Sequence, residues 1–404
     1  MGLLENTDFE NCTKCTICTE YCPVSANNSL FPGPKQSGPD GERLRLKDAS
    51  FYDTALLHCT NCKRCEVVCP SGVKIGDIIQ LAAEKYGRRK FSPRNFILSH
   101  TDLMGGLSTP FAPLVNAVTA VPAVKGILDS ALGVPRERHL PSYAFGTFRR
   151  WFGKEAAARQ AGFSRQAAFF HGCYINYNNP SLGRDVLTAL NAFGVGVQLL
   201  AREKCCGVPL IANKFFDAAR HNAFINKQSL REAIGRGLPV VVASSTCAMT
   251  LRDEYPNILG VDTTPLHGKI DLVTRFLHRL LEEGREVSLK PLKLRVAYHT
   301  ACHLERIGWA AYSIDLLKRI PGLEVVLLES RCCGIAGTYG FKKENYETSQ
   351  KIGAELFRQV EESGADLIAC DCETCKWQIE MSTTKKCEHP VTLFARAITG
   401  EKVL

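Results

Sequence analysis

The sequence predicts a multidomain α+β protein, in which a small helical segment and a connecting segment precede two similar α/β domains. Three observations lead to this prediction. The chain has 404 residues, which is more than one hydrophobic core usually serves, and its 45% hydrophobic and 23% charged residues are typical of globular proteins. Its 19 cysteines fall in tight clusters, which indicates metal ligation rather than disulfides. In the C-terminal part, strand-like and helix-like stretches alternate in the same order twice.

Residues 1–86 form the first predicted domain, which contains two cysteine runs of identical spacing. They are Cys12-x2-Cys15-x2-Cys18-x3-Cys22-Pro23 and Cys59-x2-Cys62-x2-Cys65-x3-Cys69-Pro70. In bacterial ferredoxins with this spacing, three cysteines bind one [4Fe–4S] cluster and the fourth binds the neighbouring cluster. We therefore expect one cluster on Cys12, Cys15, Cys18 and Cys69, and a second on Cys59, Cys62, Cys65 and Cys22. Structural zinc is the alternative, although its ligands usually come in separated pairs.

Residues 87–165 are predicted to connect the domains, and most of the excess positive charge lies here. Residues 85–154 contain eleven Lys or Arg and three Asp or Glu, so they carry 11 − 3 = +8 of the net +9. An apolar stripe at helical spacing is formed by Val124, Ile127, Leu128, Ala131 and Leu132. Basic residues flank it: Lys85, Arg88, Arg89, Lys90 and Arg94 before, and Arg136, Arg138, Arg149 and Arg150 after. This pattern is typical either of a membrane-surface element or of a packed helix with solvated charges.

No stretch of the sequence is predicted to cross a membrane. A transmembrane helix needs roughly 20 apolar residues. The best candidate, residues 111–134, is interrupted by Pro113, Asn116, Pro122, Lys125 and Asp129. The N-terminus also has no apolar stretch of the kind found in secretory signals. We therefore expect at most a peripheral association with a membrane.

Residues 166–291 and 292–404 form the two predicted α/β domains, with mainly parallel sheets. The strands are expected at residues 167–170, 195–200 and 240–243, and again at 294–298, 325–328 and 366–369. Helices are expected at 185–193, 218–233, 310–319 and 346–362. The chain places cysteines after each strand: Cys173, Cys205-Cys206-Gly207 and Cys247 in the first domain, and Cys302, Cys332-Cys333-Gly334, Cys372 and Cys375 in the second.

This arrangement resembles the cysteine-rich CCG domains found in the B subunit of heterodisulfide reductase and in related iron–sulfur proteins. The resemblance implies a non-cubane [4Fe–4S] cluster on Cys302, Cys332, Cys333, Cys372 and Cys375. The first copy departs from the pattern, because residues 244–250 offer only Cys247. Its four cysteines could hold an iron–sulfur cluster, a zinc ion or no metal; they are Cys173, Cys205, Cys206 and Cys247.

Two cysteines and three histidines lie near these motifs without belonging to them. Cys370 and Cys387 have no counterpart in the first copy, and we expect them to be buried structural residues. His171, His299 and His303 flank the first cysteine of each repeat. For these histidines, packing or hydrogen bonding beside a cluster is favoured over ligation.

The sequence contains no evident site for an organic redox cofactor. No Gly-x-Gly-x-x-Gly run opens a helix after a strand, and no phosphate-binding Gly-x4-Gly-Lys-Ser/Thr run is present. A chain with clusters alone can pass single electrons, but it does not take two electrons from an organic substrate by the usual routes. We therefore expect a subunit that is not catalytic alone and that depends on partners.

Several stretches outside the cysteine motifs resemble the iron–sulfur C subunits of anaerobic glycerol-3-phosphate dehydrogenases; they are residues 32–36, 38–48, 95–105, 333–346 and 371–383. The resemblance implies anaerobic respiration on glycerol 3-phosphate, in which flavin-bearing A and B type subunits oxidise the substrate. This subunit would pass the electrons to menaquinone at the cytoplasmic face of the bacterial inner membrane. No nucleic-acid partner is expected.

Three alternative functions stay open from the sequence. The first is the iron–sulfur subunit of a glycolate or lactate oxidase, which shares the same cysteine motifs. The second is an enzyme that reduces disulfides, like heterodisulfide reductase. The third is an assembly scaffold in which the cysteines hold structural zinc.

Overall fold

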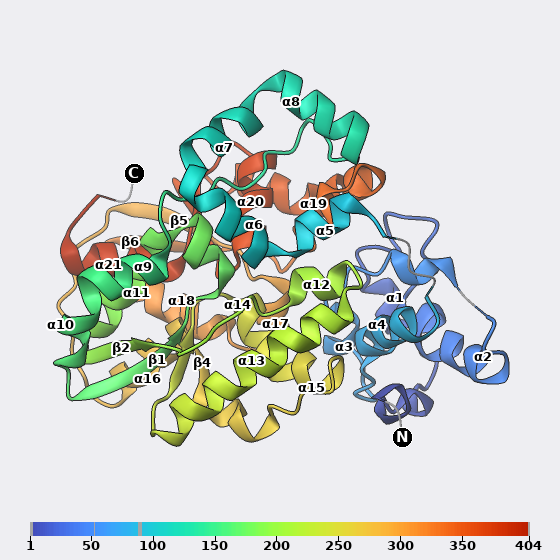
Figure 1. Cartoon of the computed structure of the whole chain (residues 1–404), viewed down its shortest axis with the longest axis horizontal. Helices are drawn as coiled ribbons and strands as arrows, with labels where there is room; N and C mark the ends of the chain where they lie inside the picture. Colours follow the sequence, from blue (N-terminus) through green and yellow to red (C-terminus); the bar gives the residue numbers. More distant parts are fainter. Residues whose placement is uncertain (1–2, 52, 88–90, 403–404) are drawn as a thin grey trace.

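The computed structural model describes residues 3–51, 53–87 and 91–402. The N-terminal domain lies at one end of the molecule, and the two α/β domains form the remainder (Figure 1). The helices of the connecting segment run across one side of the α/β domains and reach toward the N-terminal domain (Figure 1).

The N-terminal domain has few regular elements and a small core. Its helices are short except for α4 (Ile75–Lys85), whose Ile75, Ile78 and Ile79 are buried. The others include η2 (Phe9–Asn11), α1 (Ile17–Glu20), α2 (Gly41–Lys47) and α3 (Arg64–Val67). Cysteine side chains belong to this core, so the domain is built around its predicted ligands.

Each α/β domain contains one sheet of four parallel strands, which confirms the predicted fold class. The first sheet has the order β2-β1-β3-β4, with strands β1 (Arg165–Phe170), β2 (Val195–Leu199), β3 (Val240–Val242) and β4 (Ile270–Leu272). The second has the order β6-β5-β7-β8, with β5 (Leu294–Tyr298), β6 (Leu323–Leu327), β7 (Leu367–Ala369) and β8 (Cys387–Glu388). Strands β4 and β8, of three and two residues, were not predicted.

The predicted helices are present, and three of the four begin earlier than predicted. They are α11 (Pro180–Ala192), α13 (Phe216–Gly235), α18 (Ala310–Lys318) and α19 (Lys343–Glu362). Helix α11 begins five residues before its predicted start, at residue 180 rather than 185. The missed signal is a cap, because the Asn179 side chain accepts a hydrogen bond from the Leu182 backbone N–H.

The last helix of each α/β domain packs against the other domain. Helix α16 (Val273–Glu282) contacts α18, and α21 (Pro390–Thr399) contacts α11. Thr392 Oγ1 donates to the Asp185 carboxylate across this interface at 2.8 Å. One hydrophobic core runs through both domains as a result. The two cysteine sites are therefore held in fixed positions relative to each other.

The connecting segment folds as a series of helices. They are α5 (Pro93–Ser99), α6 (Thr101–Ser108), α7 (Ala112–Ala120) and α8 (Pro122–Ile127), followed by a π-helical turn at Leu128–Leu132. The predicted apolar stripe lies on α8 and this turn, but its side chains are exposed or only partly buried and form no core.

Within the described residues, no single helix is long and apolar enough to span a bilayer. Thr101–Ala120 and Pro122–Leu132 meet that test only as a pair, and the two helices are bent by 79° relative to each other.

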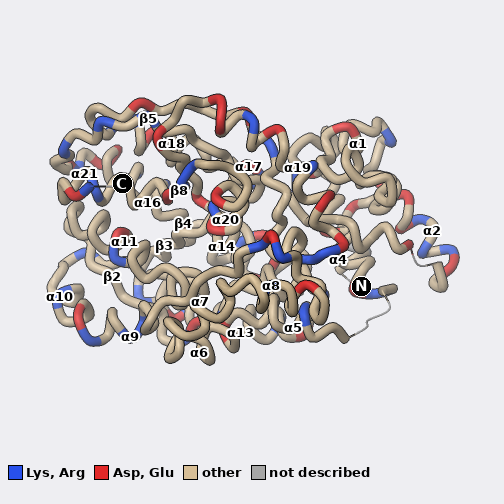
Figure 2. The backbone as a smooth tube through the Cα atoms, turned by 90° about the horizontal axis from the view of Figure 1, so that it is seen from above, with Lys and Arg blue, Asp and Glu red and all other residues tan. Residues whose placement is uncertain are grey.

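Several of the predicted flanking basic residues bind protein groups. Arg138 is buried in the second α/β domain, Arg94 pairs with Glu344 at 2.6 Å, and Arg149 donates to the Leu200 carbonyl at 2.7 Å. Arg88, Arg89 and Lys90 lie outside the described residues. Figure 2 shows Lys, Arg, Asp and Glu positions along the backbone in many other parts of the chain.

Candidate metal centres

The two cysteine runs of the N-terminal domain have matching backbones. In each run the residues on both sides of the second cysteine have left-handed conformations: Lys14 and Thr16 with φ of 61° and 65°, and Asn61 and Lys63 with φ of 55° and 64°. This region is uncommon for residues other than glycine. It winds each loop tightly, so that the three thiols of a run face one pocket.

Each of these pockets receives its fourth cysteine from the other run. One small cavity is lined by Cys12, Cys15, Cys18 and Cys69. A second is lined by Cys59, Cys62, Cys65 and Cys22. The contact between α1 and α3 brings the two runs together. The structure thus gathers both predicted sets, including the two crossed members.

The chemistry of these donors fits a metal cluster. Burial raises the pKa of the Cys22 thiol to about 12, and the neighbouring Cys62 acts in the same direction. Burial also raises the pKa of Cys18, which lies near the other thiols of its set. Four thiolates confined in one pocket repel each other unless cations lie between them. Such a set suits a centre of several iron ions, which supplies that positive charge.

The second α/β domain gathers all five cysteines that the resemblance implied. Cys302 begins α17 (Cys302–Ile307), Cys332 and Cys333 follow β6, and Cys372 caps α20 (Glu373–Ser382). These positions meet because parallel strands end at the same edge of the sheet. The Sγ atoms of Cys333 and Cys375 are 3.3 Å apart. Burial, together with Cys332, Cys333 and Cys372, raises the pKa of Cys302.

The glycine after the paired cysteines is required by the backbone. Gly334 has φ of +85°, and a Cβ atom there would lie 2.1 Å from the Ser349 carbonyl oxygen. Its N–H donates to Cys332 Sγ at 3.4 Å. Any other residue would displace α19 or the cysteine pair.

The first α/β domain brings its four cysteines together and has a serine at the position of the fourth of the five cysteines in the second domain. Hydrogen bonds from Cys173 and Cys206 hold the pKa of Cys205 well below its usual range. Ser244 caps α14 (Ser245–Met249) as Cys372 caps α20, and its Oγ accepts from the Cys247 backbone N–H at 3.4 Å. Ser244 therefore stands where the second domain has its fourth ligand.

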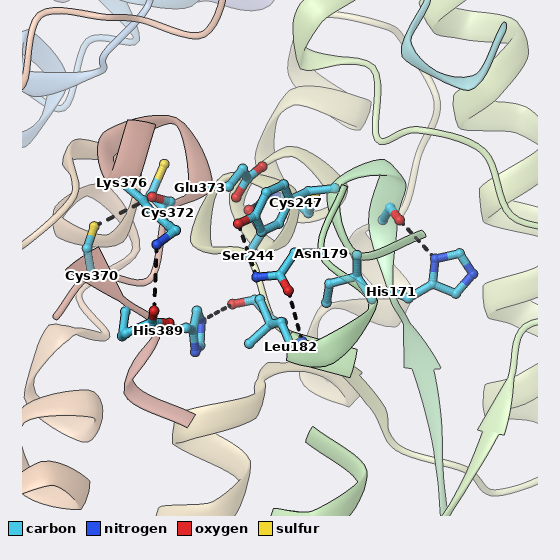
Figure 3. Close-up of a pocket in the computed structure, with 15 residues that line it drawn as sticks. His171, Asn179, Leu182, Ser244, Cys247, Cys370, Cys372, Glu373, Lys376 and His389 are labelled. Atoms are coloured by element: carbon cyan, nitrogen blue, oxygen red, sulfur yellow. Dashed lines mark hydrogen bonds and ion pairs between the residues drawn. The ribbon is translucent and has the colours of Figure 1, made fainter. Parts of the chain in front are cut away.

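Glu373 is the acidic residue between the two cysteine-rich sites. It lies close to Ser244 and Cys247 on one side and to Cys372 on the other (Figure 3). Burial and the neighbouring Cys372 raise the pKa of its carboxyl to about 8.

Both cysteine-rich sites open into one cavity of about 90 Å³. Cysteines of both α/β domains line it, and Cys62 of the N-terminal domain does so as well. Cys62 also raises the pKa of Cys302 and of Cys332, which reflects its closeness to both. The hydrogen bond from the Ser245 N–H to the Asp371 carbonyl, 2.9 Å, ties the two motif loops together. Three of the four cysteine sets therefore meet at this point.

Two of the flanking histidines make protein hydrogen bonds. His303 bridges three parts of the chain, with Nδ1 3.3 Å from Thr246 Oγ1 and Nε2 3.2 Å from the Asn61 carbonyl. His171 Nδ1 lies 2.9 Å from the Gly172 carbonyl, and burial lowers its pKa to about 4.

His299 has a different environment, which the sequence analysis missed. A ring nitrogen of His299 and the Sγ atoms of Cys370 and Cys375 lie within 4.8 Å of one another, and all three residues are buried. The predicted strand ends could have indicated that His299 and Cys370 lie close together. The predicted strands end at Tyr298 and Ala369, which are paired in the sheet, and His299 and Cys370 follow them directly. Cys370 is thus buried as expected but adjoins the predicted ligands, whereas Cys387 is buried in β8.

Two protein-family models match parts of the chain. Residues 8–73 match the 4Fe-4S dicluster domain, and residues 167–252 and 296–380 match the Cysteine-rich domain. The fold and the cysteine sites define an iron–sulfur electron-transfer subunit.

Similar proteins identify the family. The C subunit of the anaerobic glycerol-3-phosphate dehydrogenase from Escherichia coli K12 is 62% identical over 396 residues, which cover 98% of this chain and 100% of that protein. This chain belongs to the same family, the C subunits of anaerobic glycerol-3-phosphate dehydrogenase. The D subunit of the dihydromethanophenazine:CoB–CoM heterodisulfide reductase from Methanosarcina mazei is 24% identical over 91% of this chain and 88% of its own. A crystal structure of a hypothetical protein from Helicobacter pylori has a TM-score of 0.48 at 12% identity, covering 99% of this chain and 76% of that one.

Proposed function

We propose that this chain carries electrons from flavin-bearing A and B type subunits, which oxidise glycerol 3-phosphate to dihydroxyacetone phosphate, to menaquinone. The name of the 62% identical relative supports the substrate and the multisubunit complex. One observation supports electron transfer through this chain: Cys62 and cysteines of both α/β domains line the same cavity.

The proposed cofactors are two cubane [4Fe–4S] clusters on the sets Cys12, Cys15, Cys18, Cys69 and Cys59, Cys62, Cys65, Cys22. A non-cubane [4Fe–4S] cluster is proposed on Cys302, Cys332, Cys333, Cys372 and Cys375, and a further iron–sulfur cluster or a zinc ion on Cys173, Cys205, Cys206 and Cys247. When bound, iron–sulfur clusters supply one-electron redox chemistry. The chain positions their ligands and buries most of them from water.

The arrangement supports an order for the relay. Cys15 is exposed, so the first set is the entry for electrons from the flavin-bearing subunits. The second set follows, because crossed ligation joins the two ferredoxin-type sites. Electrons then pass to the cysteine site of the second α/β domain, because Cys62 lies close to Cys302 and Cys332. The cysteine site of the first α/β domain, which lines the same cavity, is the last centre in this order.

We further propose that α6, α7 and α8 attach the complex to the cytoplasmic face of the inner membrane. No Lys, Arg, Asp or Glu occurs at positions 103–124. Leu107, Phe111 and Leu114 are 62%, 63% and 65% exposed. Figure 2 shows α7 without a charged residue. An exposed apolar surface of this kind is typical of a contact with lipid or with another protein.

The electron-transfer proposal is tested with the anaerobically purified complex of all three subunits. Addition of glycerol 3-phosphate should bleach the visible absorbance of the clusters, and a water-soluble naphthoquinone should restore it. The chain without its partners should not respond to glycerol 3-phosphate. Cluster reduction by lactate or glycolate with other flavoproteins, or reduction of a mixed disulfide by the chain alone, would support one of the alternative functions instead.

The membrane proposal predicts a loss of binding when the exposed apolar side chains become polar. A variant with Leu107→Gln, Phe111→Gln and Leu114→Gln should bind vesicles of anionic phospholipid at least about tenfold more weakly, because each buried side chain contributes about 1.5–3 kcal/mol. Cosedimentation at moderate salt measures this. The control is Phe224→Gln, a change at a side chain that is 57% exposed and belongs to α13 rather than to α6, α7 or α8. Equal binding by wild type and triple variant would contradict lipid contact.

A further inference from the structure

A second cavity lies between the connecting segment and the two α/β domains. Its volume is about 180 Å³, twice that of the cavity shared by the cysteine sites. Helices α5, α6 and α7 contribute Ile97, Met104 and Thr119 to its walls, and the second α/β domain contributes Phe341 and Trp377. Apolar and aromatic side chains predominate, as in sites for flat organic rings.

The inner end of this cavity reaches the cysteine sites. Five residues line both this cavity and the one shared by the cysteines: Cys173, Pro209, Gly337, Glu373 and Thr374. Cys173 belongs to the set at the end of the proposed relay, and Thr374 lies between Cys372 and Cys375. A ring bound here would therefore lie against ligand-bearing loops of both α/β domains.

Helix α6, which forms one wall, is fastened to the first cysteine-rich site. The Asp102 carboxylate accepts a hydrogen bond from the Cys205 backbone N–H at 2.8 Å. Gly105, one turn further, packs on the Tyr177 ring so closely that a Cβ atom would lie 2.3 Å from it. The distance between the wall and the cysteines is thus set by direct contacts.

One hydroxyl-bearing residue of the cavity wall is able to donate a hydrogen bond. Thr338 lines the cavity, and its Oγ1 accepts a hydrogen bond from Asn213 Nδ2 at 2.8 Å. Across the described part of the chain, this hydroxyl donates to no protein acceptor. Because a hydroxyl has one proton of its own, it can donate that proton to a bound oxygen. Tyr174 also lines the cavity, but its hydroxyl bonds to Asn179, which lines the neighbouring pocket shown in Figure 3.

The outer side of the same helices carries the exposed apolar side chains described above. Met104 and Thr119 face the cavity, whereas Leu103 and Val118, their neighbours in sequence, are 46% and 44% exposed. Ile97 both lines the cavity and is 43% exposed, which places it at the opening. A lipid-soluble molecule could therefore enter from a membrane held against α6 and α7.

We propose that this cavity binds the ring of a lipid-soluble quinone, with Thr338 as a hydrogen-bond donor to one of its carbonyl oxygens; the inference rests on the proposed function. Reduction adds two electrons and two protons and converts both carbonyls to hydroxyls. The electrons arrive singly from the flavin-bearing subunits through the clusters, and the protons come from water.

The test uses the complex of all three subunits with menadione, a naphthoquinone without a tail, in equilibrium dialysis. Met104→Trp fills the cavity, and Ile97→Trp closes its opening at a partly exposed position that tolerates a larger side chain. Each should weaken menadione binding at least about tenfold. Ala117→Trp places the same ring on the exposed side of α7, outside the cavity, and should leave menadione binding and reduction unchanged.

The outcomes separate this inference from the function on which it rests. If the wild-type complex neither binds menadione nor reduces it with glycerol 3-phosphate, the proposed function fails. If the wild type does both, and Ile97→Trp and Met104→Trp bind menadione as the wild type does, the quinone site lies elsewhere and only the inference is overturned. Weaker binding in the two cavity variants alone supports it, and a thermal melt of each variant confirms that it is folded.

Discussion

Replacing Cys69 with alanine is expected to remove the cluster of the first cysteine run, although Cys69 belongs to the second. Cys69 lines the pocket of Cys12, Cys15 and Cys18. The single variant should lose about four iron atoms per chain, the content of one cluster. Iron analysis of anaerobically purified protein, with low-temperature EPR, measures the loss.

Two double variants show which cluster is lost. Cys69→Ala with Cys15→Ala affects one set and should lose no more iron than Cys69→Ala alone. Cys69→Ala with Cys62→Ala affects both sets and should lose about eight iron atoms. The reverse pattern would show that each run binds its own cluster. Cys387→Ala, at a buried cysteine outside every set, is the control that should keep all the iron.

Replacing Arg138 with methionine is expected to destabilise the protein by at least about 2 kcal/mol. The guanidinium is 2% exposed and donates to the Gly340 carbonyl, Gln378 Oε1 and Ser349 Oγ at 2.9, 2.6 and 3.1 Å. It also lies 4.9 Å from the centre of the Tyr346 ring. Methionine fills similar space but removes the donor to the buried Gly340 carbonyl and Gln378 Oε1; Ser349 Oγ keeps only its 3.5 Å hydrogen bond from Gln378 Nε2.

Arg136→Met is the matched control, because the same substitution two residues earlier affects a side chain that is 67% exposed. Its effect should stay within about 0.5 kcal/mol. Urea unfolding of the anaerobic protein followed by tryptophan fluorescence compares the two variants. Equal midpoints would mean that Arg138 does not anchor the connecting segment.

The sequence came close to the fold of the α/β domains because their signal is local. Strand β5 was predicted with its observed ends, Leu294–Tyr298, since an apolar run between polar segments marks a buried strand. Helix α11 was shortened, because its first turn depends on the Asn179 cap rather than on periodicity. The fourth strand of each sheet is short and acquires its partner only in the folded sheet.

The connecting segment was the least predictable part. Its composition suggested exposed charge around a helix, yet Arg138 is buried and satisfied by groups 202 to 240 residues away in sequence. The exposed apolar side chains of the segment extend beyond the predicted stripe to Leu107, Phe111 and Leu114. Long-range contacts of this kind leave no periodic trace in a sequence.

The cysteine runs identified this chain as an iron–sulfur protein from sequence alone and predicted two ferredoxin-type sites, because the spacing of thiols on a short loop limits which of them can face one cluster. The whole-chain resemblance supplied the family. Only the tertiary structure brought Cys62, Cys302 and Cys173 to one cavity and set α5, α6 and α7 beside it. The reason is physical: ligand spacing is a property of local backbone geometry, whereas the order of the centres depends on how separate domains pack.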